Sequence, residues 1–170
     1  MIENQHKDFK VRTLKGMIAY QKHGVNFCVP ENWATVEDDL DETIRAITIE
    51  CPNDGIYMID IYNSYQAPSL ENYIQKSMAH FKNELPLGSK IIDGPHRNVE
   101  KCINQEVETL GVRFDFIIRT LFRQQIQYLC SYFRVESENK VSFLSSQYTF
   151  ENKASSQNGF DKIVSSYRVV

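Results

Sequence analysis

The sequence has 170 residues, a formal net charge of −3, 42% hydrophobic residues and 24% charged residues. These values are typical of a globular protein, and the length supports a core that needs neither disulfides nor a metal. The small negative charge argues against a protein whose whole surface binds nucleic acid, because phosphate binding requires a concentrated excess of Lys and Arg. We therefore expect one domain over residues 1–170, with its core at about 17–168.

The N-terminal segment gives an expectation about location. Residues 1–11 are polar, and we expect them to be poorly ordered, as chain ends usually are. Residues 1–16 mix both charges and contain no apolar run of the length that a signal peptide or a membrane span requires. We expect a cytoplasmic protein without stable membrane insertion. The cysteines are far apart and form no C-x-x-C motif, so we expect buried thiols rather than disulfides; they are Cys28, Cys51, Cys102 and Cys130.

The first third of the chain predicts two hairpins. Residues 17–20 and 25–29 indicate one hairpin, which ends at a turn before Trp33, the only Trp. We expect Trp33 to fill one end of the core, with ligand stacking as the alternative. The acidic run at 37–42 lacks the glycine and the alternation of an EF-hand loop, so we expect a solvated loop there, with adventitious cation binding as the alternative.

The second hairpin is predicted at residues 44–50 and 56–63. The connection at 51–55 contains Pro, Asn, Asp and Gly, which are turn formers. Apolar side chains occur on both faces of residues 56–63, which indicates that both faces of this strand are covered.

The segment at 69–85 is the best helix in the sequence. Its apolar residues repeat at helical spacing, Ser69 is placed to cap the first turn, and Pro86 ends the helical hydrogen bonding. The repeating residues are Leu70, Tyr73, Ile74, Met78, Phe81 and Leu85. Because its neighbours alternate with a period of two, we expect this helix to cover one face of an antiparallel sheet, leaving the opposite face, or a groove beside the terminal helix, for a partner.

The remaining chain predicts further strands and a second helix. A short strand at 90–92 and a breaker at 93–95 precede a weaker strand at 99–107. Three longer strands follow at 112–122, 126–136 and 141–150, and a polar link at 153–158 leads to a short helix. That helix has one apolar face, with Phe160, Ile163, Val164 and Tyr167. This order predicts an α+β fold with an antiparallel sheet of about six to eight strands flanked by helices, rather than a βαβ parallel sheet.

The sequence offers little support for an enzyme. The seven glycines form no phosphate-binding loop, and the four histidines have no metal-ligand spacing, so we expect no cofactor and no metal. His96 and Cys102 are the least implausible nucleophilic pair, and a small hydrolase or transferase that uses them is the enzymatic alternative. Since only geometry defines such a site, we expect a protein that is not an enzyme.

One face of the segment at 112–122 carries arginines, while the other carries Phe and Ile. Arginines and the tyrosines of the next strand supply contact area and directed hydrogen bonds, which favours a protein interface. The candidate protein-binding residues are Arg113, Arg119, Arg123, Tyr128 and Tyr132. An ordinary solvent face, balanced by Asp115 and Glu136, is the alternative.

Several of these elements together resemble the PsbP-like superfamily, which includes DcrB-like bacterial proteins and a eukaryotic Ran-binding transport factor. The similar features are a strand that ends in a Pro-x-x-Trp turn (27–33), the helix start at 69–74, the antiparallel meander and the closing helix at 160–166. The resemblance implies an α-β-α sandwich and a binding or assembly role. In one bacterial branch, associated with type VI secretion, small cytoplasmic members chaperone the transmembrane segments of effectors. No position here matches a functional residue of the family, and DcrB and the photosystem subunits are exported.

We therefore expect a non-enzymatic intracellular protein-binding module, a chaperone or adaptor for a secreted type VI effector. An immunity protein that blocks a toxin is the main alternative. The expected partner is another protein, not nucleic acid, and a homodimer stays open.

Overall fold

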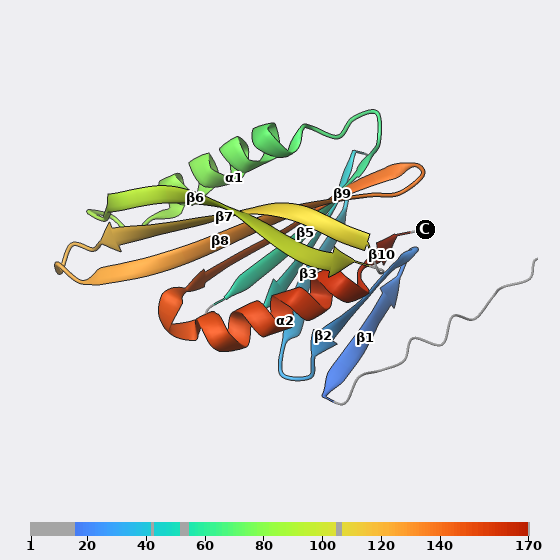
Figure 1. The fold of residues 1–170 in the computed structure, drawn as a ribbon, viewed down its shortest axis with the longest axis horizontal. Coiled ribbons are helices and arrows are strands. Elements are labelled where there is room, and N and C mark those ends of the chain that lie inside the picture. The colour runs from blue at the N-terminus through green and yellow to red at the C-terminus, as the bar shows by residue number, and fades with distance from the viewer. Residues whose placement is uncertain (1–15, 42, 52–54, 105–106, 170) are drawn as a thin grey trace, which may run out of the picture.

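The computed structural model describes residues 16–41, 43–51, 55–104 and 107–169. A seven-stranded antiparallel sheet has the strand order β3-β4-β5-β9-β8-β7-β6, and a smaller sheet has the order β1-β2-β10 (Figure 1). The strands are β1 (Met17–Lys22), β2 (Val25–Pro30), β3 (Ala34–Leu40), β4 (Ile44–Glu50), β5 (Ile56–Asn63), β6 (Lys90–Asn104), β7 (Val107–Arg119), β8 (Gln125–Glu136), β9 (Lys140–Thr149) and β10 (Arg168–Val169). The predicted α+β class, with an antiparallel sheet flanked by helices, is confirmed.

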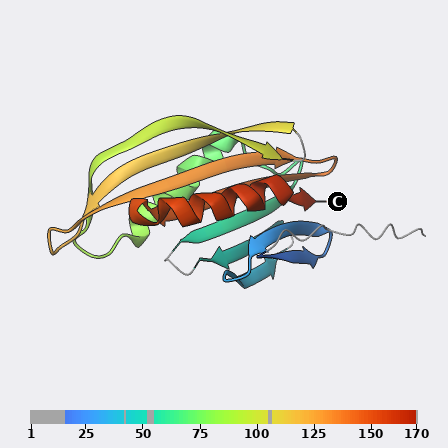
Figure 2. The ribbon, with the colours of Figure 1, turned by 60° about the horizontal axis from the view of Figure 1, so that its bottom comes forward.

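Helix α2 (Lys153–Ser166) and the small sheet cover one face of the large sheet. Figure 2 shows α2 along this side, with the strands of the small sheet below it. The core here is aromatic: the rings of Trp33 and Tyr57 stack with centroids 4.7 Å apart, and Tyr57 stacks in turn on Phe160. Trp33 is therefore a core residue, as predicted.

Helix α1 (Leu70–Glu84) covers the other face, and of the predicted residues it buries Tyr73, Ile74, Met78 and Phe81, while Leu70 and Leu85 are half-buried. The Ser69 side chain accepts a hydrogen bond of 3.2 Å from the backbone N–H of Asn72, which caps the first turn. Tyr73 stacks on Phe143 of β9 with centroids 4.2 Å apart, and Phe81 meets Phe116 of β7 edge to face. The ring contacts of α1 thus go to β7, β8 and β9, at one side of the sheet.

The prediction of a solvated acidic loop was wrong, because β3 occupies residues 34–40. Asp38 lies opposite Ile47 and receives a hydrogen bond of 2.9 Å from Nε of Arg45 in β4. An ion pair between two neighbouring strands therefore holds an acidic segment in the sheet, although the low strand preference of its residues indicates a loop. Glu42, within the same predicted run, lies outside the described residues.

The predicted break at 93–95 is also wrong, since β6 runs through it. The pairing of β6 with β7 shifts register between Ile91 and Asp93 and again between Asp93 and His96. Because β6 is an edge strand, Pro95 need not donate a ladder hydrogen bond to a second neighbour, and the shifts accommodate it.

The predicted polar link at 153–158 belongs to α2. Ala154, Ser155 and Asn158 lie on its exposed side, whereas Ser156 is buried, so the segment is polar because of its solvent face.

The expectation for residues 1–11 falls outside the described residues, as does the middle of the predicted turn at 51–55. At the ends of that turn, the Cys51 N–H donates a hydrogen bond of 2.9 Å to the Gly55 carbonyl. No helix among the described residues is both long and apolar enough to cross a membrane.

Candidate functional site

The structure does not place the five predicted interface residues on one surface. Tyr128 and Tyr132 lie on the face that α1 covers, where Tyr132 is only 4% exposed and meets the Tyr73 ring. Arg113 and Arg119 lie on the opposite face, because they alternate along β7 with Phe114 and Ile118 of the α1-side core. Arg123 sits in the connection between β7 and β8.

Arg113 also makes an ion pair within the protein. Its Nη1 donates a hydrogen bond of 3.3 Å to Oε1 of Glu100 on β6, and Gln157 of α2 also donates to that oxygen. Arg113 thus ties β7 to β6 beneath α2, which is an architectural role.

His96 and Cys102 do not form a nucleophilic pair. They lie six residues apart along the same strand, β6, which corresponds to about 20 Å at the rise of an extended chain. His96 Nε2 instead lies 3.1 Å from Oδ1 of Asp93, and burial raises the pKa of the Cys102 thiol to about 11. Over the described ranges, no group of three His, Cys, Asp or Glu side chains is arranged to hold a metal ion.

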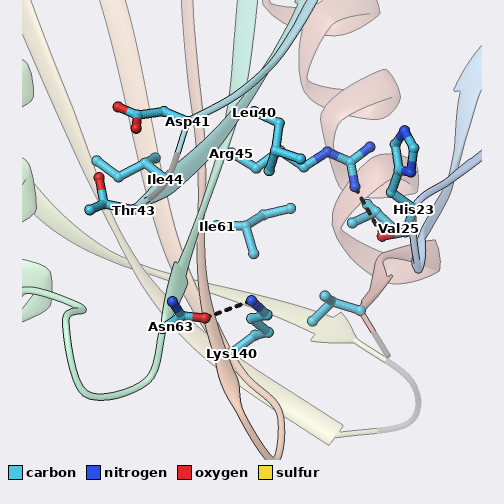
Figure 3. Close-up of a pocket in the computed structure, with 11 residues that line it drawn as sticks. His23, Val25, Leu40, Asp41, Thr43, Ile44, Arg45, Ile61, Asn63 and Lys140 are labelled. Atoms are coloured by element: carbon cyan, nitrogen blue, oxygen red, sulfur yellow. Dashed lines mark hydrogen bonds between the residues drawn. The ribbon is translucent and has the colours of Figure 1, made fainter.

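One cavity, of about 210 Å³, lies beside Arg45 near the ends of β4 and β5 (Figure 3). The Arg45 side chain reaches toward the backbone at His23, and Lys140 donates a hydrogen bond of 2.7 Å to Oδ1 of Asn63. Although Arg45 would suit an anionic ligand, it is only 5% exposed.

The Arg45 guanidinium has no donor left for a ligand. A guanidinium carries five N–H donors, and here they bond to both carboxylate oxygens of Asp38, to the carbonyls of Lys22 and His23, and to the Tyr20 hydroxyl. Hydrogen bonds to its carboxylate, chiefly from Arg45 and also from the Lys22 ammonium and the Tyr20 hydroxyl, hold the pKa of Asp38 well below its usual range. Arg45 at the edge of this cavity therefore has a structural role: it pairs with Asp38 inside the large sheet and bonds to the β1–β2 hairpin of the small sheet.

A second cavity, of about 300 Å³, lies between α1 and β5, and we call it the α1 groove. Its floor contains Met58 and Asp60 of β5 and Ser145 of β9. Its wall, from α1, contains Tyr73, Ser77 and Phe81, and its rim contains Lys76, His80 and Glu84.

The groove results from where α1 rests and from the size of the side chains beside it. Helix α1 packs on the aromatic rings of β7 to β9 and leaves the same face of β3 and β4 uncovered. Thr48 of β4 lies opposite Met58, and Ala46 lies opposite Asp60, so small side chains border the floor. The expectation that both faces of β5 are covered holds only in part: Tyr57, Ile59 and Ile61 are buried, while Ile56 is 39% exposed.

Asp60 is a candidate site residue that the sequence alone did not indicate. Its Oδ2 accepts a hydrogen bond of 2.6 Å from the Tyr73 hydroxyl, whose oxygen lies 3.4 Å from Oγ of Ser145. Burial raises the pKa of Asp60, and the Tyr73 hydrogen bond offsets only part of that rise. Among the described residues, no cation lies within ion-pair distance of Asp60. The sequence feature that could have indicated it is an acidic residue between Met58 and Tyr62, on a strand face that is otherwise largely apolar.

Comparison with known proteins supports the fold. No protein-family model matches this sequence, and a search of curated proteins finds no relative. Among solved structures, cyanobacterial PsbP (CyanoP) from Synechocystis sp. PCC 6803 is similar at 12% identity with a TM-score of 0.54, over 94% of this chain and 95% of that chain. LpqN of Mycobacterium tuberculosis, described as involved in cell envelope biogenesis, is 10% identical with a TM-score of 0.45, over 86% and 83% of the two chains. The fold is PsbP-like.

Proposed function

We propose that this protein is a non-enzymatic binding protein that holds a segment of another protein in the α1 groove. The observation that carries the proposal is the half-covered sheet face, where a mostly apolar groove with the half-buried carboxylate of Asp60 stays open beside α1. Concave, mostly apolar sites with a few oriented polar groups are typical binding sites. This groove lies beside the helix at 69–85, not on the sheet face opposite it.

We propose the finer role, an intracellular chaperone or adaptor for a secreted type VI effector, on the resemblance to the PsbP-like superfamily. Known members of that superfamily act as binding or assembly factors, which supports a role without chemistry. The distance between His96 and Cys102 along β6 favours the same reading over a hydrolase or transferase.

The proposal is tested by filling the groove. Ser77 lines the groove from α1, whereas Gln75 lies on the exposed side of the same helix. Ser77→Trp introduces a bulky ring into the cavity, and Gln75→Trp introduces the same ring into solvent. Tagged wild-type protein and both variants are purified from the native host, and the chains that accompany them are identified by mass spectrometry after the fold has been checked by circular dichroism.

We expect the same partner with the wild type and Gln75→Trp, and its loss with Ser77→Trp. Recovery of that partner in equal amounts with Ser77→Trp contradicts binding in the groove, and a wild-type protein that purifies without any partner contradicts the adaptor role. If the partner is a toxin that this protein inhibits, the immunity-protein alternative replaces the chaperone role.

A further inference from the structure

The acidic side chains around the α1 groove select the chemistry of its occupant. Side chains that face α1 alternate along β3, β4 and β5 with those that face α2, and opposite residues in the ladder share a face. On the α1 side these strands carry Glu37, Asp39, Glu50 and Asp60. Within the described parts of the three strands, this side carries no Lys or Arg.

The groove presents Asp60 at its floor with part of its bonding capacity unused. A carboxylate can accept up to about four hydrogen bonds, and within the described part of the chain the side chain of Asp60 accepts one, from Tyr73. Since the single Tyr73 proton goes to Asp60, the Ser145 hydroxyl is left to donate to the Tyr73 oxygen. This chain of hydrogen bonds orients the carboxylate, which is half-buried. Because a carboxylate that is partly removed from water and has no cation beside it costs free energy, Asp60 favours a cationic occupant.

Apart from tyrosines, the other ionisable groups that line the groove lie on its rim, and none of them pairs with Asp60 in the described structure. On the rim, His80 Nε2 lies 3.1 Å from Oε1 of Glu84, and both side chains are exposed. Lys76 also lies on the rim, and it makes no ion pair within 4.0 Å in the described structure. The apolar lining beside Asp60, from Met58 and Phe81, suits the aliphatic stem of a long basic side chain.

We propose that the α1 groove binds a partner segment that inserts one Lys or Arg side chain, flanked by apolar residues, onto the Asp60 carboxylate. This inference rests on the proposed function and adds the chemistry of the partner. The Lys or Arg stem lies against Met58 and Phe81, its charged end reaches Asp60, and the neighbouring apolar residues contact Ile56 and Tyr62. The outer acids Glu37, Asp39 and Glu50 raise the local concentration of basic segments.

The test is selection from a phage-displayed library of short random peptides. Wild-type protein, Asp60→Asn and the control Asp161→Asn are immobilised separately. Asp60→Asn keeps the shape of the side chain and an acceptor for Tyr73, and Asp161→Asn removes the same charge from the exposed side of α2. One selected peptide is then synthesised, with a second version in which norleucine replaces its basic residue, and both are titrated against the three proteins.

We expect peptides selected on the wild type and on Asp161→Asn to share a Lys or Arg beside an apolar residue, and peptides selected on Asp60→Asn to lose that preference. The peptide affinity should fall about tenfold or more with Asp60→Asn and with the norleucine version. The proposal is overturned by selected peptides without a basic preference, by the same preference on Asp60→Asn, or by a library that yields no binder. Loss of the cellular partner with Ser77→Trp but not with Asp60→Asn would overturn this inference and leave the proposed function standing.

Discussion

Gly159 allows α2 to pack closely against the core at Trp33. It lies inside the helix, where Gly normally costs stability relative to Ala. A Cβ atom at this position would lie 2.0 Å from Cη2 of Trp33, and Trp33 stacks on Tyr57 behind it. The helix can approach the indole only because residue 159 has no side chain.

Gly159→Ala should destabilise the protein by about 1–3 kcal/mol, because the added methyl group overpacks the Trp33 site. Asn158→Ala, on the exposed side of the same helix, is the control and should change the free energy of unfolding by no more than about 0.5 kcal/mol. Urea denaturation measures both. Since Trp33 is the only Trp, its fluorescence in the folded state should shift with Gly159→Ala alone. An unshifted spectrum and unchanged stability would contradict this packing.

Asp38→Asn tests the buried ion pair that holds β3. The Asp38 and Arg45 side chains are 11% and 6% exposed, so removing one charge leaves the other buried without its partner. We expect a loss of about 3–5 kcal/mol at neutral pH, measured by urea denaturation. Asp39→Asn, the exposed neighbour, should have little effect.

The contribution of the Asp38–Arg45 pair to the free energy of unfolding should depend on pH. Because the folded protein lowers the pKa of Asp38 from its ordinary value of 3.8, the ion pair contributes fully above that value and is lost as the pH falls toward the lower folded value. The stability difference between the wild type and Asp38→Asn should thus be constant near neutrality and shrink in acid below about 3.8. A difference that shrinks already at neutral pH would contradict the assignment.

Asp60→Asn should have the opposite effect on stability. Burial raises the pKa of Asp60 above 3.8, so the folded protein holds the proton more tightly than the unfolded chain does. Its charged form therefore costs stability above the folded pKa, and that cost disappears as the pH falls to the ordinary aspartate range. We expect Asp60→Asn to be more stable than the wild type at neutral pH, with the gain vanishing at low pH. Thermal unfolding over a pH series checks this, and a less stable Asp60→Asn protein at neutral pH would count against it.

At the scale of elements, α1 is held by apolar and aromatic packing, and some of its buried residues line the groove while others do not. Ile74 is 3% exposed and belongs to the core between α1 and the sheet, but it does not line the groove. Arg97 of β6 adds an ion pair of 3.0 Å with Glu71 near the start of the helix. The buried Ile74 therefore holds the helix that forms the groove wall, and the half-exposed ion pair adds little to it.

Ile74→Ala should cost about 2–5 kcal/mol through lost burial and the cavity left behind, which urea denaturation measures. Gln75→Ala on the exposed side is the matched control and should be close to neutral. Comparable losses in the two variants would mean that the helix does not bury the predicted face.

The elements that the sequence predicts well are those with local signals. The helix at 69–85 has a cap, a stripe and a terminating Pro, and the structure confirms its position. Strand β3 was missed because Glu37, Asp38 and Asp39 have low strand preference, and the ion pair that overrides it comes from β4. The groove could not be predicted either, since it requires the register of Ala46 and Thr48 against β5 and the position of α1 on β7 to β9.

At the scale of the molecule, the two faces of the large sheet have different roles in this account. The α2 face is filled by an aromatic core and by the small sheet, and its buried cation, Arg45, is fully bonded inside the protein. The α1 face is closed over β7 to β9 and open over β3 to β5, where acidic side chains gather. A near-neutral net charge therefore conceals a local surface suited to a basic segment.

Site-specific photo-cross-linking in the native host tests the central claim most directly. A photoreactive phenylalanine analogue is placed at Ser77 in the groove, at Gln75 on the outside of α1, or at Ile103, which is 63% exposed on β6. We predict a cross-linked partner at Ser77 alone, attached through a segment that mass spectrometry identifies as apolar with a Lys or Arg. A partner cross-linked at Gln75 or Ile103 but not at Ser77 would contradict the claim that the α1 groove is the binding site.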